Sequence, residues 1–298
     1  MFKAVVSVIG RDQKGVVARF ATHLAERGIN ILDIQQQVVH GQFIMDMLVD
    51  LADMTVSLDE LIPGLVELGK SISMDVRVAL HSRRRRKLAI LVSKETHCLE
   101  HLIQEQKAGT LNCEIDCVLG NHPDLEPIAK QANLPFEWKA TTGDTGKQAH
   151  FDWLFDKLKH HSIDLVVLAR YMQILPAAIV QAFPYRIINI HPSLLPYFPG
   201  ANPYDQAHKA GVRVSGCTAH YVTESLDEGP IILQDVFHIE VGTDTAVDVR
   251  RKGQALEART LGQAVQMHLD EKLVVIDDKV VFRPGISRFL DHENSVGA

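Results

Sequence analysis

The sequence lacks the features that mark a membrane-bound or secreted protein. No apolar run is long enough to cross a bilayer, and the amino terminus, Met-Phe-Lys-Ala-Val-Val-Ser, has no signal-peptide layout. Only four cysteines are present, none in a Cys-x-x-Cys pair, and a chain of 298 residues needs no disulfides to fold. We therefore expect reduced thiols, a cytoplasmic location and no membrane partner.

An excess of basic residues is also missing. The net charge is −6, and Lys and Arg gather only in the run Arg-Arg-Arg-Arg-Lys at residues 83–87. In a basic protein such a run favours a nucleic-acid patch, but in an acidic chain it is more typical of a solvated linker. We expect no nucleic-acid partner, and we expect a domain boundary at this run.

Two common catalytic motifs are absent as well. No Gly-x-Ser-x-Gly elbow surrounds Ser193, so a serine nucleophile is not indicated. No His-Glu-x-x-His or Cys-x-x-Cys pair accompanies His191, so we expect no bound metal. The chemistry must therefore come from other polar groups.

The first 80 or so residues show a regular succession of strand and helix patterns. Strand patterns occupy residues 3–9, 31–40, 42–51 and 74–80, and Gly41 marks a hairpin between the middle two. Apolar residues recur at helical spacing from Val16 and again from Leu58. The order βαββαβ predicts a ferredoxin-like domain.

Two segments of this domain resemble the ACT domain family. They are Gly-x-Asp-x-x-Gly-Val-Val at Gly10–Val17 and Gly-Ile-Asn-Ile at Gly28–Ile31. The resemblance implies a regulatory module that binds an amino-acid effector, with the site residues Asp12, Gly15 and Asn30, or a plain dimerisation unit. It also implies a homodimer or homotetramer.

Beyond the basic run, continuous apolar strands alternate with helices. We expect strands at 88–92, 114–119, 164–169 and 186–189, with helices beginning at 98, 123, 151 and 174. This alternation predicts an α/β domain with a mostly parallel sheet covered on both faces. Residues 215–222 and 231–237 lack an intervening helix, so we expect antiparallel edge strands there, then a helix at 246–269 and a hairpin at 274–282. The expected boundaries are 1–82 for the ACT-like domain, 83–87 for the linker and 88–298 for the α/β domain.

Three polar residues in the second domain are spaced in a way that indicates chemistry. Asn189 and His191 end an apolar strand at positions i and i+2, so their side chains point the same way at the edge where α/β proteins bind ligands. Asp227 follows in a loop closed by Gly229-Pro230. An amide and an imidazolium can stabilise an oxyanion, and a carboxylate can take a proton from water or an amine. Together the three suit acyl transfer from nitrogen, whereas each taken singly could be a structural turn residue.

The segments around these residues resemble the folate-dependent formyltransferase family. Asn189–Pro196 matches its Asn-x-His-Pro-Ser-Leu-Leu-Pro motif, and Gly216–Gln234 matches Gly-x-Thr-x-His-x-Val-x-x-x-x-Asp-x-Gly-Pro-x-x-x-Gln. The resemblance implies a formyltransferase-type fold, 10-formyltetrahydrofolate as the substrate with no permanently bound cofactor, and a catalytic trio of Asn189, His191 and Asp227. It also implies substrate-binding roles for a larger set: Arg170, Met172, Gln173, Ile174, Leu175, Val180, Ile187, Val222, Thr223 and Leu226.

The family divides by the acceptor of the formyl group. Members that formylate glycinamide ribonucleotide hold its phosphate on a glycine-rich loop after the first strand of this domain. Here that place reads Ser-Lys-Glu-Thr at 93–96, with no glycine and with Glu95 to repel a phosphate. Together with the ACT-like domain, this resembles the members that use water. Those members release tetrahydrofolate and formate, which balances the one-carbon folate pool and supplies formate for purine synthesis.

Two alternatives stay open at the level of sequence. Pro192 and Leu194 are shared with the amine-using members, so glycinamide ribonucleotide remains an alternative acceptor, with Lys94 and Thr96 near its phosphate. A non-catalytic folate or amino-acid sensor is the alternative from another class. His220 lies in a strand leading to Asp227, where it either supports the site or belongs to the core.

Overall fold

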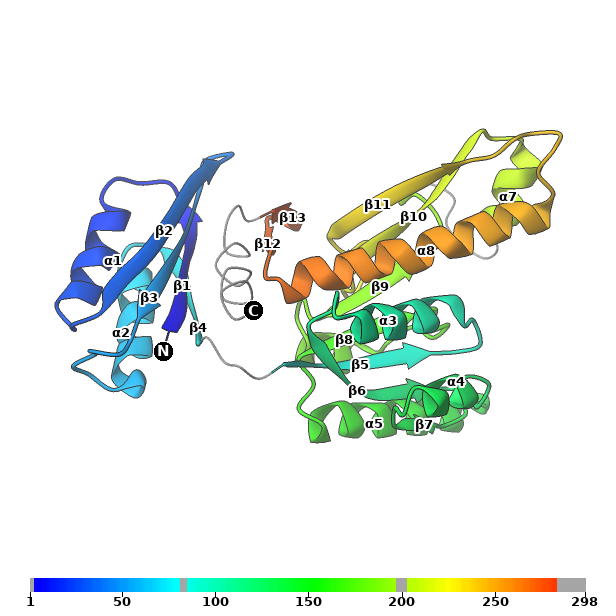
Figure 1. Cartoon of the computed structure of the whole chain (residues 1–298), viewed down its shortest axis with the longest axis horizontal. Coiled ribbons are helices and arrows are strands. Elements are labelled where there is room, and N and C mark those ends of the chain that lie inside the picture. The colour runs from blue at the N-terminus through cyan, green and yellow to red at the C-terminus, as the bar shows by residue number, and fades with distance from the viewer. Residues whose placement is uncertain (1–2, 81–84, 197–202, 283–298) are drawn as a thin grey trace. The chain divides into compact units, whose positions relative to one another are not determined.

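The computed structural model describes residues 3–80, 85–196 and 203–282. These residues divide into two compact units, one formed by residues 3–80 and the other by the described residues from 85 to 282 (Figure 1). In the described part of the chain, no helix is long and apolar enough to cross a membrane.

The first unit is a four-stranded antiparallel sheet with two helices. Its elements are β1 (Lys3–Arg11), α1 (Val16–Ala25), β2 (Asn30–Val39), β3 (Gln42–Asp50), α2 (Leu58–Ser71) and β4 (Met74–Leu80). The strand order is β2-β3-β1-β4. This is the ferredoxin-like βαββαβ arrangement, so the predicted fold class of this region is confirmed.

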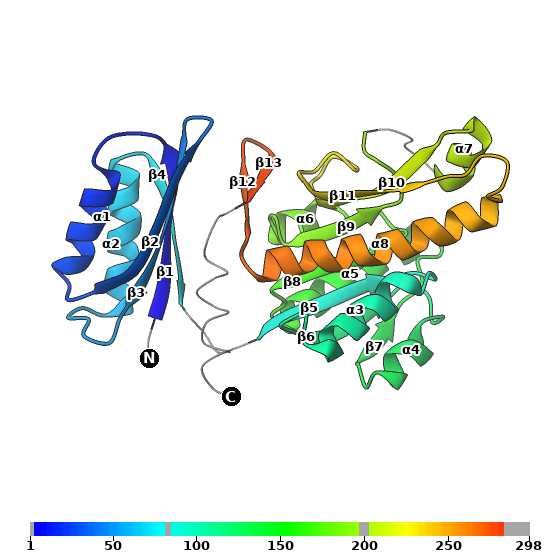
Figure 2. The same ribbon diagram turned by 45° about the horizontal axis from the view of Figure 1, so that its top comes forward.

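One face of this sheet shares an apolar core with both helices. Side chains alternate along β1 and β3, so Val6 and Met47 turn to the side where Phe20 of α1 and Leu65 of α2 lie. All four side chains are fully buried, and Figure 2 shows both helices on the same side of the sheet. Burial of each such side chain is worth about 1.5–3 kcal/mol.

The connection between β2 and β3 is a tight turn. His40 has φ 51° and Gly41 has φ 78°. Two successive positive φ angles are what a two-residue hairpin turn of the type that matches strand twist requires. The hairpin predicted at Gly41 is confirmed.

The structure separates the residues expected to bind an effector. Asp12 follows the end of β1, and Gly15 lies at the start of α1 with φ 84°, whereas Asn30 begins β2. Asn30 is in register with Asp50, the residue that pairs with the first residue of β1, so it lies at the opposite end of the sheet, about 30 Å from Asp12 at the rise of an antiparallel strand. Within a single chain the structure therefore does not bring the three residues together. An effector site that used all of them would need more than one copy of the chain.

The second unit is built on a seven-stranded sheet. Its first half contains β5 (Arg86–Val92), α3 (His97–Ala108), β6 (Cys113–Gly120), α4 (Glu126–Gln131), β7 (Phe136–Trp138), α5 (Gly143–His160), β8 (Leu165–Ala169) and α6 (Ala177–Ala182). Its second half contains β9 (Ile187–His191), α7 (Pro203–Ala210), β10 (Val214–Tyr221), β11 (Ile231–His238), α8 (Ala246–Leu269), β12 (Leu273–Ile276) and β13 (Lys279–Phe282).

The strand order of this sheet is β11-β10-β9-β8-β5-β6-β7. The five strands from β9 to β7 run parallel, while β10 and β11 pair antiparallel at one edge. The predicted parallel sheet, its antiparallel edge strands and the β12–β13 hairpin are confirmed. The chain crosses from one side of β5 to the other between β7 and β8, and ligands bind at the carboxyl end of a sheet beside such a switch in strand order.

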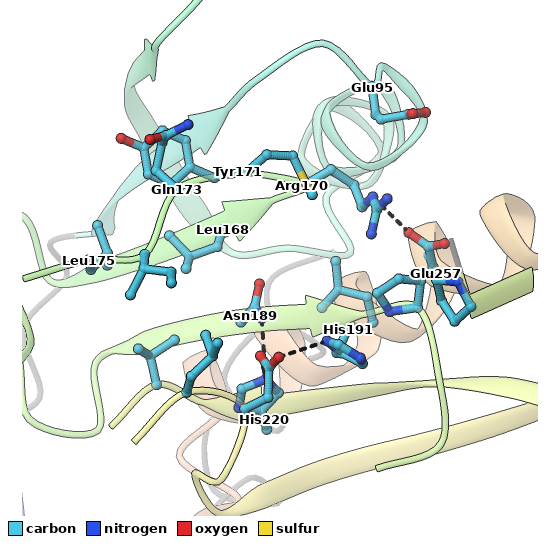
Figure 3. Close-up of a pocket in the computed structure, with 18 of the residues that line it drawn as sticks. Glu95, Leu168, Arg170, Tyr171, Gln173, Leu175, Asn189, His191, His220 and Glu257 are labelled. Carbon is cyan, nitrogen blue, oxygen red and sulfur yellow. Dashed lines mark hydrogen bonds and ion pairs between the residues drawn. The ribbon is translucent and has the colours of Figure 1, made fainter. Parts of the chain in front are cut away.

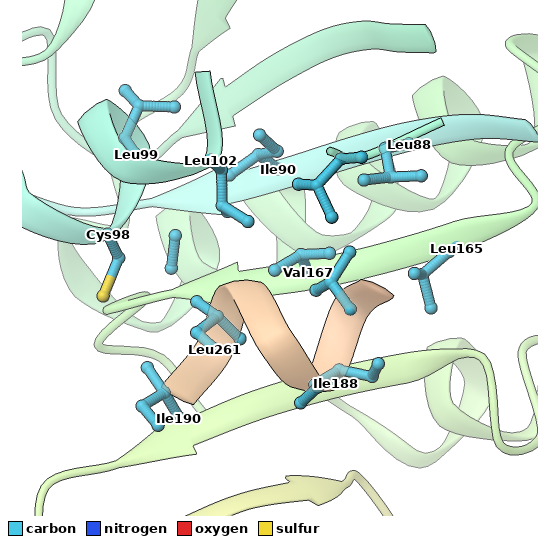
Figure 4. Close-up of a cluster of buried hydrophobic side chains, with 14 of the residues drawn as sticks. Leu88, Ile90, Cys98, Leu99, Leu102, Leu165, Val167, Ile188, Ile190 and Leu261 are labelled. Carbon is cyan, nitrogen blue, oxygen red and sulfur yellow. The ribbon is translucent and has the colours of Figure 1, made fainter. Parts of the chain in front are cut away.

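Both faces of the seven-stranded sheet are covered. On one face, Ile90, Val167 and Ile188 pack with Leu102 of α3 and Leu261 of α8 (Figure 4). On the other face, the neighbouring strand residues pack on α5 and α6. Successive strand side chains thus enter opposite cores, which is why these strands read as continuous apolar runs.

Several elements differ from the predicted ones. The sequence patterns do not predict β7 or α7, and they begin α5 too late and α4 and α6 too early. α6 starts at Ala177 because the preceding Pro176 is extended and Arg170, with φ 60°, opens an irregular segment after β8. Residues 170–175 are therefore a loop.

The expected linker at 83–87 is partly wrong. Residues 83 and 84 lie outside the described part of the chain, but Arg86 and Lys87 are the first two residues of β5. They pair in parallel with β6, the ammonium of Lys87 lies 2.6 Å from a carboxylate oxygen of Asp116, and Arg86 forms an ion pair with Glu271. Charge partners at the start of the strand hold these two residues in the sheet.

His268, in the last turn of α8, gives the second unit a pH-dependent stability. The Tyr221 hydroxyl donates a hydrogen bond to Nδ1 of His268 (2.8 Å), and burial together with the charges of Arg86 and Arg186 lowers the pKa of His268 to about 4. An unfolded histidine has a pKa of about 6.5. The unfolded state therefore binds a proton first as the pH falls, and stability is lost between about pH 6.5 and pH 4.

We expect the wild-type protein to lose about 2 kcal/mol of unfolding free energy from this group between pH 7 and pH 5. His268→Gln keeps an acceptor for the Tyr221 hydroxyl but does not titrate. Urea unfolding at the two pH values should therefore show a smaller loss in the variant. An equal loss in both proteins would contradict this assignment.

Candidate active site

A cavity of about 590 Å³ lies at the carboxyl ends of β8 and β9. The loop after β8, the end of β9, the β10–β11 loop and α8 all contribute to its wall. Figure 3 shows Asn189 in the middle of this wall, with Leu175 on one side of it and Glu257 on the other. The cavity therefore has an apolar end, a middle that contains Asn189 and a charged end.

The structure brings Asn189, His191 and Asp227 together, as the sequence predicts. Asn189 and His191 lie on β9, two residues apart, and both line the cavity (Figure 3). Asp227 comes from the loop between β10 and β11, and its Oδ2 lies 3.2 Å from Nδ1 of His191. Since a carboxylate only accepts, Nδ1 of His191 carries a proton and donates a hydrogen bond to Asp227.

His220 completes the group as a fourth member. It is opposite Asn189 in the β9–β10 register, is almost fully buried, and its Nδ1 lies 2.9 Å from the backbone carbonyl of Tyr221. That carbonyl requires Nδ1–H, so Nε2 of the neutral ring accepts a hydrogen bond from the Asn189 amide at 3.2 Å. The bond fixes the direction of the amide and leaves its second N–H for the cavity. His220 is thus a supporting residue of the site.

His191 acts on the charge of Asp227. Its hydrogen bond is the largest of the effects that hold the pKa of the Asp227 carboxyl far below its usual value, although partial burial opposes this shift. The other ring nitrogen of His191, Nε2, is buried and has no hydrogen-bond partner among the described residues. A buried polar atom without a partner in a cavity wall is a place for a substrate atom to bind.

The β10–β11 loop can carry Asp227 only because of the glycine that follows. A side chain at Gly229 would place its first carbon 1.8 Å from the carbonyl oxygen of Tyr221. The Tyr221 amide donates to the carbonyl of Pro230 (3.0 Å), which closes the loop, and Asp227 has φ 56°, a conformation that aspartate tolerates. The Asp-x-Gly-Pro part of the motif therefore sets the loop that presents the carboxylate.

Thr218 and Gln234, also in the motif, hold the segment after His191. The Thr218 hydroxyl donates to the carbonyl of Ser193 (2.8 Å) and accepts from the amide of Leu195 (3.0 Å). The Gln234 side chain donates to the same hydroxyl at 2.9 Å and to the Leu195 carbonyl at 3.0 Å. These motif residues therefore hold the backbone of the segment after β9 in place.

Most of the residues expected to bind substrate line the cavity. They are Arg170, Met172, Gln173, Ile174, Leu175, Val222, Thr223 and Leu226. Met172, Ile174 and Leu226 are each about 60% exposed, which is unusual for large apolar side chains and is typical of a ligand surface. Val180 and Ile187 do not line the cavity. Val180 faces the core from α6 and Ile187 lies one strand repeat below Asn189, so both belong to the packed core behind it.

The loop at 170–175 is anchored by residues that the sequence patterns do not single out. The amide of Met172 donates to the Ser93 hydroxyl (2.9 Å), which donates to the side chain of Asn121 (2.7 Å). Buried His150 bonds the carbonyl of Lys139 through Nδ1 (2.6 Å) and the Tyr171 hydroxyl through Nε2. These contacts join residues far apart in sequence, so no local pattern reveals them.

Two groups of side chains among the described residues have the spacing of metal ligands. They are His97, Cys98 and Glu257, and Asp116, Cys117 and His161. A cation already lies in each group, because Arg170 Nε is 3.3 Å from Glu257 and Lys87 Nζ is 2.6 Å from Asp116. Burial raises the pKa of Cys98 well above its ordinary value and that of Cys117 to about 12, so both thiols keep their protons. Neither group is suited to a metal ion.

The chain is similar to known proteins along most of its length. Residues 86–265 match the formyl transferase family and residues 3–79 match the ACT domain family. A formyltetrahydrofolate deformylase from Synechocystis is 40% identical over 272 residues, which cover 91% of this chain and 94% of that protein. The crystal structure of a formyltetrahydrofolate deformylase from Pseudomonas syringae has a TM-score of 0.85 and 33% identity, covering 95% of this chain and 94% of the other.

The fold, the site and these matches show that the chain belongs to the formyl transferase family. Within it, the chain falls among the formyltetrahydrofolate deformylases, which it matches across both domains. A glycinamide ribonucleotide transformylase from Symbiobacterium toebii is similar over 67% of this chain, with a TM-score of 0.62.

Proposed function

We propose that this chain hydrolyses 10-formyltetrahydrofolate to tetrahydrofolate and formate. The observation that carries the proposal is the convergence of Asn189, His191 and Asp227 on one cavity, in a chain that matches deformylases through both domains. The reaction balances the one-carbon folate pool and supplies formate for purine synthesis, as in the family.

The proposed chemistry starts at Asp227. Its carboxylate holds a water molecule and takes a proton as the water oxygen attacks the formyl carbon. The depressed pKa of Asp227 keeps the group ionised throughout the physiological range, so the proton-accepting form is always present. Addition of water converts the formyl group into a tetrahedral intermediate with negative charge on the former carbonyl oxygen.

Asn189 and His191 stabilise that oxyanion. The free amide N–H of Asn189 and Nε2 of His191 both belong to the cavity wall, and neither is used by another described residue. Since Nδ1–H of His191 is directed to Asp227, Nε2 can donate to the oxyanion only from the imidazolium form. The C–N bond then breaks, the folate nitrogen regains a proton, and formate and tetrahydrofolate leave.

Cofactor use, location, assembly and regulation complete the proposal. The substrate is the folate itself, and we infer that no permanently bound cofactor takes part. We further infer a cytoplasmic enzyme that forms a homodimer or homotetramer and binds an amino-acid effector through its ACT domain. The ACT match supports a small-molecule effector, and the separation of Asp12 from Asn30 within one chain makes assembly and effector binding interdependent.

Purified protein with 10-formyltetrahydrofolate and no amine separates the candidate functions. We expect equal amounts of formate and tetrahydrofolate to accumulate with repeated turnover. Turnover that required glycinamide ribonucleotide would indicate a transformylase, and binding without turnover would indicate a sensor. Either result would overturn the proposal.

A further inference from the structure

The charged end of the cavity is organised around one buried carboxylate. Glu257, on α8, is only 1% exposed although it lines the cavity. The Tyr204 hydroxyl donates to its Oε1 at 2.7 Å, while Arg170 Nε lies 3.3 Å and His97 Nε2 3.1 Å from its Oε2. A buried carboxylate is stable only when it is paired and hydrogen-bonded, so these groups depend on one another.

Arg170 is held in this cluster against its backbone preference. Its φ of 60° lies in the left-handed region that favours glycine, and its Nε is buried with no hydrogen-bond partner among the described residues. A long side chain in that conformation costs about 1 kcal/mol or more and persists where its surroundings require it. Figure 3 shows the Arg170 guanidinium turned towards Glu257 and across the charged end.

His97 joins this cluster to the segment after β5. Its Nε2 faces Glu257, and its Nδ1 lies 3.8 Å from Glu95. Glu95 in turn accepts a hydrogen bond from Gln254 of α8 at 2.8 Å. The charged end is therefore bordered by a connected set of side chains from α3, α7, α8 and two loops, which we call the acceptor-end network.

We propose that the acceptor-end network, and the Arg170–Glu257 pair above all, restricts the acceptor of the formyl group to water. This inference rests on the proposed function and names the residues that set its specificity. With folate at the apolar end and the catalytic trio in the middle, an amine acceptor has to enter from the charged end. Arg170 and Glu257 occupy that entrance.

The charges at this end of the cavity also disfavour an amine acceptor. An amine beside Glu95 is held as an ammonium ion, because a neighbouring carboxylate favours the protonated form. An ammonium ion has no lone pair with which to attack the formyl carbon. A phosphate-bearing amine is in addition repelled by Glu95. Water is small and neutral, so neither the space nor the charge excludes it.

The test opens this end of the cavity without straining the fold. Arg170→Gly removes the guanidinium and suits a φ of 60° better than arginine does. Glu257→Gln in the same chain removes the carboxylate charge that would otherwise be left unpaired. Arg251→Ala is the matched control, because it breaks an ion pair with Asp248 that also lies on α8 but does not line the cavity.

Wild type, the double variant and the control are each given 10-formyltetrahydrofolate with increasing glycinamide, and formate and N-formylglycinamide are measured. We expect only formate from the wild type and the control. In the double variant we expect N-formylglycinamide to appear, and its ratio to formate to rise with amine concentration.

Three results would overturn the inference: transfer to glycinamide by the wild type, continued hydrolysis without transfer by the double variant, or loss of both reactions in a double variant that still binds folate. The last would mean that the network serves hydrolysis itself. Failure of the proposed function is a separate outcome, since it appears as absence of formate from the wild type before any amine is added.

Discussion

Asp227→Asn is expected to lower the turnover of 10-formyltetrahydrofolate by about 10²–10⁴-fold, the usual contribution of a general base. The affinity for folate should stay close to that of the wild type. The amide has the shape of the carboxylate and can still accept from Nδ1 of His191, but it cannot take a proton from water. Steady-state kinetics together with equilibrium binding of a folate measure both quantities.

The backbone at position 227 accommodates the Asp227→Asn substitution. Asp227 has φ 56°, and asparagine is among the few residues that adopt the left-handed region readily, so the loop should keep its conformation. Asp235 of β11 pairs with Arg259 of α8 outside the cavity, and it provides a matched Asp→Asn control with turnover near that of the wild type. Near-wild-type turnover in Asp227→Asn would remove Asp227 from the mechanism.

Asn189→Leu is expected to reduce kcat by about 10²–10³-fold, which is the cost of losing one oxyanion donor. The donor acts on charge that develops during the reaction, so KM should change little. Leucine has a similar size and keeps the position filled, but the amide N–H that faces the cavity is lost. The kinetic constants of the variant give the division between kcat and KM directly.

A loss confined to KM would mean that Asn189 binds the ground state only, which contradicts the oxyanion role. His220→Gln provides a comparison, because it removes only the group that orients the Asn189 amide. Its effect should be smaller, about fivefold, since a single hydrogen bond contributes about 1 kcal/mol.

The grouping of the proposed catalytic residues could be predicted from the sequence because local patterns encode it. Alternation on β9 puts Asn189 and His191 on one side, and the Asp-x-Gly-Pro turn presents Asp227. α8 was predictable from 246 to 269 for a similar reason, since a Thr245–Asp248 capping box starts it. Long apolar strands likewise identify a covered parallel sheet.

The arrangement of side chains at the charged end of the cavity could not be predicted from the sequence. Glu257 lies 87 residues beyond Arg170 (257 − 170), and only the folded sheet brings them together. The irregular loop after β8 reads as a helix from Ile174, because neither the left-handed Arg170 nor its anchors Ser93 and His150 leave a local signal. Short elements such as β7 and α7 are likewise set by packing partners more than by their own sequence.

Turnover in ¹⁸O-labelled water tests the central claim, that water is the acceptor of the formyl group, most directly. Attack by water at the formyl carbon puts one solvent oxygen into each formate released, beside the oxygen already present in the formyl group. Mass spectrometry of formate formed without any amine should therefore show a single label in each molecule, with an equal amount of tetrahydrofolate. Absence of formate, or formate without the label, would contradict the account.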